Sequence, residues 1–145
     1  MAIIKVLVVD DETDFLEMTV KRLLKRNIFC EGVSSGREAV EKVRDGSFDV
    51  VLLDVKMPGM NGLETLQEIK QHKPLVEVVM LTGHASVESG IDGMKLGAFD
   101  YLMKPMELEP LLEILLDAAE RKAIQEAKIT KAELTRNLRG QRPGP

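Results

Sequence analysis

The stretch Val-Val-Leu-Leu-Asp-Val-Lys-Met-Pro-Gly-Met-Asn-Gly, residues 50–62, decides the fold of this 145-residue chain. Its first four residues form the short apolar run that is typical of a strand buried on both faces, and this run ends at Asp54. Pro58-Gly59 and Asn61-Gly62 then interrupt regular structure. Open α/β sheets bind their ligands at the carboxyl ends of parallel strands. Asp54 is therefore a candidate functional residue, although a lone aspartate in this position is more often an ordinary turn residue.

The composition, 44% hydrophobic and 30% charged, is typical of a water-soluble globular protein of one domain. We expect a cytoplasmic protein without membrane contact, because the sequence contains neither a long apolar run nor the pattern of a signal peptide. Residues 1–119 carry 13 basic and 21 acidic side chains, whereas residues 120–145 carry 7 and 3. The acidic body argues against direct nucleic-acid binding by the folded domain, since such binding depends largely on basic residues.

Apolar and polar residues alternate in a pattern that predicts five strands and five helices. The predicted strands are Ile3–Val9, Ile28–Val33, Phe48–Leu53, Val76–Leu81 and Phe99–Met103. The predicted helices run from Thr13 to a stop at Asn27, from Ser35 to Asp45, from Leu63 to a stop at Pro74, from Ser86 to Leu96, and onward from near Glu107. Strict alternation of this kind predicts a parallel sheet with helices on both faces, which is a three-layer α/β fold.

The fourth predicted helix differs from the others because it contains two glycines. Its apolar residues Val87, Ile91 and Met94 are expected to form the buried face. Gly90 and Gly93 each cost a helix about 1 kcal/mol relative to alanine. We expect this helix to be the loosest of the five.

Four of the five predicted strands end on polar residues. These residues are Asp10 and Asp11, Asp54, Thr82, and Lys104. Parallel strands bring such ends to one edge of the sheet, where neighbouring carboxylates repel each other by about 4 kcal/mol per pair. Mg²⁺ or Mn²⁺ suits an all-oxygen site of this type, and both ions often accompany phosphoryl groups. The Lys104 charge and the Thr82 hydroxyl are suited to phosphoryl oxygens, and we infer that Asp54 is the nucleophile that accepts the phosphoryl group.

Four motifs together carry a resemblance to a known family. They are Val-Val-Asp-Asp-Glu (8–12), Leu-Leu-Asp-Val-Lys-Met-Pro-Gly-Met-Asn-Gly (52–62), Leu-Thr-Gly-His (81–84) and Asp-Tyr-Leu-Met-Lys-Pro (100–105). In this order and spacing they resemble the receiver (CheY-like) domains of two-component response regulators, over roughly residues 3–120. The resemblance implies a doubly wound, flavodoxin-like sheet of five strands in the order 2-1-3-4-5, within a receiver domain at residues 1–120.

The resemblance also implies the chemistry of the site. Asp54 would accept a phosphoryl group from a phosphohistidine of a sensor histidine kinase in a Mg²⁺-dependent reaction. Asp11 and Asp54 would bind Mg²⁺ directly together with the main-chain carbonyl of Lys56, and Asp10 would act through metal-bound water. The domain would catalyse only its own phosphorylation and slow autodephosphorylation, so it would not be an enzyme that turns over an external substrate.

Further roles follow from the same resemblance. Lys104 would pair with the phosphoryl group, and its peptide bond to Pro105 would be cis. Thr82 and Tyr101 would form the switch pair, in which the hydroxyl moves toward the phosphoryl group and the aromatic ring turns inward.

The residues two places after the acceptor and two places after Thr82 tune the lifetime of the acyl phosphate in this family. Here they are Lys56 and His84, which we expect to restrict the attacking water.

Two other classes of function are considered, and the sequence disfavours both. A phosphatase with an aspartyl nucleophile would normally carry a second acid two residues after the nucleophile, and position 56 is lysine. A flavodoxin-like domain that binds a flavin or nucleotide would require phosphate-binding glycines, but no G-x-G-x-x-G or P-loop follows the first strand, and aromatic residues make up only 3% of the chain.

Residues 121–145 are expected to form a helical extension and a flexible basic tail. The extension would pair with a second copy in a homodimer or lead to an output module. The sequence does not identify that output domain or downstream protein.

Overall fold

The computed structural model describes residues 3–56, 60–83 and 87–140, in which strand and helix alternate five times. The strands are β1 (Lys5–Val9), β2 (Phe29–Val33), β3 (Val50–Asp54), β4 (Glu77–Thr82) and β5 (Asp100–Met103). The helices are α1 (Thr13–Lys25), α2 (Gly36–Asp45), α3 (Gly62–His72), α4 (Val87–Lys95) and α5 (Leu108–Gly140). The alternation predicted from the sequence is confirmed.

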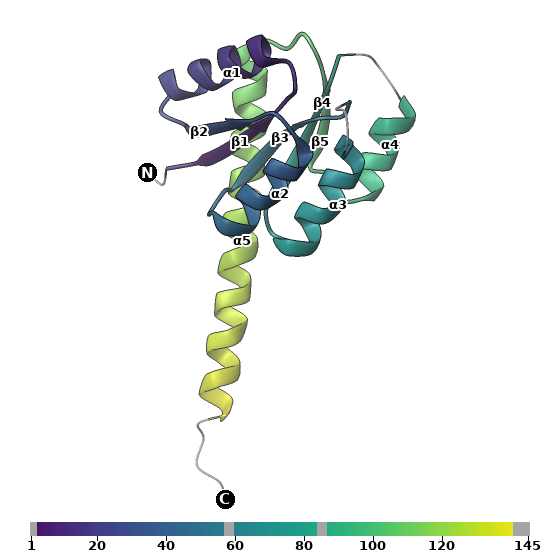
Figure 1. Cartoon of the computed structure of the whole chain (residues 1–145). Coiled ribbons are helices and arrows are strands. Elements are labelled where there is room, and N and C mark those ends of the chain that lie inside the picture. The colour runs from purple at the N-terminus through teal and green to yellow at the C-terminus, as the bar shows by residue number, and fades with distance from the viewer. Residues whose placement is uncertain (1–2, 57–59, 84–86, 141–145) are drawn as a thin grey trace, which may run out of the picture.

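The five strands form one parallel sheet in the order β2-β1-β3-β4-β5, which confirms the flavodoxin-like topology (Figure 1). Every residue of the central strands β3 and β4 is buried, as expected for strands covered on both faces. In the sheet register, Val9 lies beside both Val33 and Leu53. The residues that follow β1 and β3 therefore meet at the same edge of the sheet.

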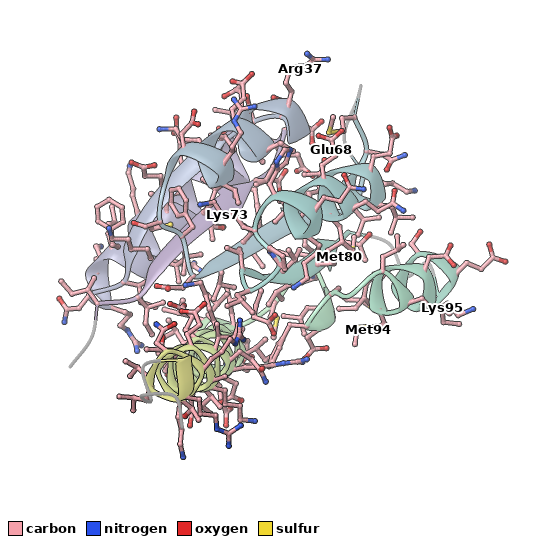
Figure 2. The ribbon with its side chains drawn as sticks, turned by 90° about the horizontal axis from the view of Figure 1, so that it is seen from below. Arg37, Glu68, Lys73, Met80, Met94 and Lys95 are labelled. Atoms are coloured by element: carbon pink, nitrogen blue, oxygen red, sulfur yellow. The ribbon has the colours of Figure 1, made fainter. Side chains whose placement is uncertain are left out.

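Helices cover both faces of the sheet and create two apolar cores, because successive side chains of a strand point to opposite faces. One core packs α2 and α3 against the sheet and includes Leu53, Leu66 and Met80. The other packs α1 and α5 against the opposite face and includes Leu23 and Leu52. Seen from below, α5 lies on one side of the sheet and α2, α3 and α4 lie on the other, with Met80 on the side of α3 and α4 (Figure 2).

Helix α4 packs against the sheet through its glycines, which corrects one prediction. Ile91 and Met94 were expected to be buried, but they are 49% and 47% exposed. Gly90 and Gly93 are buried instead, and a Cβ atom added at Gly93 would lie only 2.5 Å from the Met80 sulfur. The bare helix backbone therefore approaches the sheet more closely than apolar side chains would allow. That α4 is the loosest helix stays a prediction.

Helix α5 is a single 33-residue helix that leaves the body of the domain (Figure 1). Its buried residues end at Ala119. The division of the chain at residue 120 stays a prediction, and residues 141–145 of the basic tail lie outside the described residues. Across the described part of the chain, no helix combines the length and the apolar character that a membrane crossing requires.

Candidate functional site

Three acids and one lysine meet at the carboxyl end of the sheet. Asp10 follows β1, Glu12 precedes the first turn of α1, Asp54 ends β3, and Lys104 follows β5. Carboxylate oxygens of Asp10, Glu12 and Asp54 all lie within 4.8 Å of one another. The Lys104 Nζ lies 2.7 Å from Asp10 Oδ2 and 3.5 Å from Glu12 Oε1. One ammonium group therefore faces a cluster of three carboxylates.

Burial and backbone hydrogen bonds fix the two central acids. Asp10 is 1% exposed and Asp54 is 6% exposed. The Glu12 main-chain N–H donates to Asp10 Oδ1 at 2.9 Å, and the Lys56 main-chain N–H donates to Asp54 Oδ1 at 3.3 Å. Each carboxylate is thus oriented by the chain that immediately follows it.

The negative charge of the cluster is only partly balanced. Burial, together with the charge of Asp10, raises the pKa of Asp54 to about 6, although the nearby Lys104 lowers it. Asp11 adds a smaller increase to the pKa of Asp54. Burial opposes the charge of Lys104, but its hydrogen bond to Asp10 and the charge of Asp54 outweigh burial, so the pKa of Lys104 is raised. The site therefore favours additional positive charge.

The Asn61-Gly62 pair after β3 begins α3 in close contact with the backbone of Asp54 and Val55. Asn61 caps α3, because its Oδ1 accepts the Glu64 main-chain N–H at 2.9 Å. A Cβ atom added at Gly62 would lie 2.6 Å from the Val55 Cα and 2.7 Å from the Asp54 carbonyl oxygen. Both neighbours are backbone atoms that cannot move aside, so this position requires glycine.

The predicted switch pair lies on the adjacent strands β4 and β5. The Thr82 side chain is buried, and its main-chain carbonyl accepts the Lys104 N–H at 2.7 Å. Tyr101 is half-buried, and its ring packs against Gly90 of α4, where an added Cβ atom would lie 3.1 Å from the ring. The peptide bond between Lys104 and Pro105 is cis, which confirms that prediction. The switching role of Thr82 and Tyr101 stays a prediction.

Not every predicted site residue joins the cluster. Asp11 is exposed and is not one of the three clustered carboxylates, so its role as a direct metal ligand stays a prediction. Lys56 is exposed, and its main-chain N–H contacts Asp54. His84 lies outside the described residues, and its proposed effect on acyl phosphate lifetime stays a prediction.

Two residues of the site had no assigned role in the sequence. Glu12 joins the cluster in addition to Asp10, and the only signal in the sequence is that it is the third acid of a consecutive run. Phe15 of α1 places its ring centroid 4.1 Å from the Lys104 Nζ. Nothing in the spacing of the sequence indicates this contact, because 88 residues separate the two positions.

The residues of the cluster fit a hard divalent cation. Carboxylate oxygens are the ligands that Mg²⁺ and Mn²⁺ prefer, and the three carboxylates lie close enough together to share one ion. Burial, and after it the charge of Asp10, raises the pKa of Asp54, and a bound cation would oppose this rise by favouring the ionised carboxylate. The cluster could therefore hold a divalent metal.

Comparison with known proteins agrees with this geometry. Residues 6–116 match the family described as the response regulator receiver domain. The chain is 40% identical over 134 residues to the Transcriptional regulatory protein ZraR of Escherichia coli O157:H7, covering 90% of this chain and 28% of that protein. A receiver domain protein (CheY-like) from Methanospirillum hungatei JF-1 has a TM-score of 0.81 and 29% identity, covering 86% of this chain and 99% of that one.

A third similar protein has a crystal structure that contains a phosphorylated aspartic acid. This response regulator from Burkholderia pseudomallei contains a phosphorylated aspartic acid and a calcium ion, and it has a TM-score of 0.74 and 26% identity over 86% of this chain and 73% of its own. The chain belongs to the family of response regulator receiver domains. It spans less than a third of the length of the curated relatives named ZraR.

Proposed function

We propose that the chain is a phosphorylation-dependent signalling switch in which Asp54 accepts a phosphoryl group from a phosphohistidine of a sensor histidine kinase. One observation carries the proposal: Asp54 is buried at the end of β3 with the Asp10 and Glu12 carboxylates within 4.8 Å. Membership of the receiver family supports the same chemistry.

In the proposed transfer, a carboxylate oxygen of Asp54 attacks phosphorus. The new O–P bond forms as the P–N bond to the donor imidazole breaks, and the bonding electron pair leaves with the imidazole nitrogen, which takes up a proton. The Asp54 pKa of about 6 leaves this carboxylate mostly ionised at pH 7. The Lys104 ammonium turns from Asp10 to a phosphoryl oxygen, and the Thr82 hydroxyl donates to another.

We propose Mg²⁺, with Mn²⁺ as a substitute, as the cofactor of this site. Asp10, Asp11, Asp54 and the carbonyl of Lys56 would hold it, with Glu12 as an additional nearby acid. The bound ion would neutralise negative charge on the transferred phosphoryl group.

The signal would pass from the acceptor to α4. When Thr82 moves toward the phosphoryl group, the Tyr101 ring turns inward beside Gly90. A later attack of water on phosphorus returns the Asp54 carboxylate and releases inorganic phosphate, and Lys56 and His84 would limit the access of that water.

We further propose a cytoplasmic setting, because kinases form phosphohistidine from cytoplasmic ATP. We also propose an output through residues 121–140 of α5. The exposed Ile124, Ile129, Leu134 and Leu138 would contact a second copy or a downstream domain. Sedimentation of the phosphorylated and unphosphorylated chain tests the homodimer, and a monomer in both states at all concentrations would exclude it.

The function is tested by incubating the chain with a small acyl phosphate and measuring its intact mass. We expect one added phosphoryl group that requires both Mg²⁺ and Asp54, so that Asp54→Asn gains none. Asp49→Asn, at the opposite end of the sheet, is the matched control and should be modified as the wild type is. Release of phosphate from external esters without a mass gain would instead favour the phosphatase.

A further inference from the structure

Among the residues that the structure describes, three different contacts hold the Lys104 ammonium. Two are with carboxylates, at 2.7 Å from Asp10 Oδ2 and 3.5 Å from Glu12 Oε1. The third is with the ring of Phe15, whose centroid lies 4.1 Å away. The Lys104 side chain is only 11% exposed. A largely desolvated ammonium over an aromatic face has the geometry of a strong cation–π contact.

The packing of α1 holds the Phe15 ring in place. Phe15 lies in the first turn of α1, three residues after Glu12, which is the N-cap residue of this helix. The Phe15 ring is half-buried and packs against the core between α1, α5 and the sheet. The ring is thus supported by the core and presents a face to Lys104.

The three contacts respond differently to a divalent cation. Asp10 and Glu12 belong to the carboxylate cluster, so a metal ion would compete with Lys104 for their oxygens. The ring carries no charge and offers no hard oxygen ligand, so a Mg²⁺ ion would not displace it. The contact with Phe15 would therefore persist when the two carboxylate contacts weaken.

We propose that Phe15 is a positioning residue that keeps the Lys104 ammonium at the site for the phosphoryl group on Asp54 after a metal ion engages the carboxylates. This inference rests on the proposed function. The ring allows the ammonium to turn from Asp10 toward a phosphoryl oxygen without first becoming exposed to water.

Two other cation–ring pairs in the described residues provide a comparison. Lys5 Nζ lies 5.6 Å from the centroid of the Phe29 ring, and the Arg121 Cζ lies 5.8 Å from that of Phe99. Phe29 is 43% exposed, and Lys5 begins β1, at the opposite end of the sheet from the acidic cluster. The Lys5–Phe29 pair therefore supplies a matched control for the same substitution.

The first experiment measures the initial rate of phosphorylation by a small acyl phosphate at saturating Mg²⁺. We expect Phe15→Leu to slow the reaction by about fivefold to tenfold, which lies between the effects of losing an exposed and a fully desolvated cation–π contact. Phe15→Tyr keeps an aromatic face and should remain within about twofold of the wild type. Phe29→Leu should leave the rate unchanged. A small donor is used so that the measured rate does not depend on the binding of a kinase.

The second experiment is independent of phosphorylation and measures the NMR shifts of the Lys104 ε-methylene protons during a Mg²⁺ titration. The ring current of Phe15 should move these protons upfield in the wild type and in Phe15→Tyr, and the upfield shift should persist at saturating Mg²⁺. Phe15→Leu should lack the shift while retaining its Mg²⁺ affinity.

Distinct results separate failure of this inference from failure of the proposed function. If the wild type is never phosphorylated, the proposed function fails. If the upfield shift of the Lys104 ε-methylene protons disappears when Mg²⁺ is added, the role of Phe15 is overturned, whether or not the chain is phosphorylated. Equal rates for Phe15→Leu and the wild type would also overturn it. Equal slowing of Phe15→Leu and Phe15→Tyr would show that packing matters rather than the aromatic face, and would overturn it as well.

Discussion

Both ends of the parallel sheet carry acidic side chains, but only at the amino-terminal end do nearby cations balance their negative charge. At that end, Glu77 is 6% exposed and has the Lys70 Nζ at 3.3 Å from Oε1 and the Arg121 Nε at 3.3 Å from Oε2. Asp49, the residue immediately before β3, lies beside Glu77, and its Oδ1 is 3.2 Å from the Lys122 Nζ. Lys122 also pairs with Glu126, so three acids there face three cations.

The carboxyl end has the opposite balance. Asp10, Glu12 and Asp54 share the single ammonium of Lys104, and the pKa of Asp54 rises to about 6. Burial is similar at the two ends, since Glu77 and Asp54 are both 6% exposed. The difference lies in the charged partners. The acids at the amino-terminal end are paired with cations of the chain, whereas the acids at the carboxyl end keep negative charge that an external cation could balance.

The largest expected effect compares the lysines of the two ends. Lys104→Met leaves the buried Asp10 without its cation and should lower the free energy of unfolding by about 3 kcal/mol without metal. Lys122→Met should lower it by less than about 1 kcal/mol, because Asp49 is more exposed. Urea unfolding in a chelator measures both. Equal losses would mean that the two ends do not differ in charge balance.

A second test adds the missing positive charge. Mg²⁺ at about 100 times its dissociation constant should raise the free energy of unfolding of the wild type by about 2.7 kcal/mol. Asp49→Asn should show the same increase, and Asp54→Asn less than half of it. An increase of equal size in Asp54→Asn would place the binding of Mg²⁺ elsewhere on the chain.

The pH dependence of stability sharpens the comparison further. Since the pKa of Asp54 rises from 3.8 to about 6 on folding, the folded state binds more protons between these values. The free energy of unfolding without metal therefore falls as pH rises through this window, by up to about 2 kcal/mol after screening by solvent.

Asp54→Asn removes this titration. The variant should be more stable than the wild type at pH 7 and no more stable at pH 4, as measured by urea unfolding in a chelator. Asp49→Asn serves as the control. A stability difference between Asp54→Asn and the wild type that does not change with pH would contradict the assigned electrostatics.

The smallest expected effect concerns the balanced end. Arg121→Ala removes one partner of Glu77 but leaves Lys70, so the free energy of unfolding should fall by about 1 kcal/mol. Lys128→Ala, farther along α5, is the control and should change it by less than about 0.5 kcal/mol. A loss from Arg121→Ala as large as that from Lys104→Met would show that Glu77 depends on Arg121 alone.

The sequence predicts which site residues stand at the carboxyl ends of the strands. The apolar run before Asp54 and the polar residues after the other strands indicate one edge of a parallel sheet, and the structure brings Asp10, Asp54 and Lys104 together there. The strand order came from the family resemblance rather than from the apolar pattern, because local periodicity does not specify which strands are neighbours.

Contacts between residues of different helices and strands could not be predicted from the spacing of residues in the sequence. Glu12 and Asp11 are equivalent acids in the sequence, and only the turn after β1 brings Glu12 into the cluster. Apolar periodicity placed Ile91 on the buried face of α4, whereas Gly90 packs there against Tyr101. A period of apolar residues cannot reveal that a helix approaches the sheet through its backbone.

The most direct test of the central claim locates the added phosphoryl group. After incubation with a small acyl phosphate and Mg²⁺, borohydride reduction converts a phosphorylated aspartate to homoserine, which peptide sequencing by mass spectrometry identifies. We expect homoserine at Asp54 and at no other acid. Homoserine at Asp10, Asp11 or Asp49, with Asp54 unmodified, would contradict the assignment of the unbalanced end of the sheet as the phosphoryl-acceptor site.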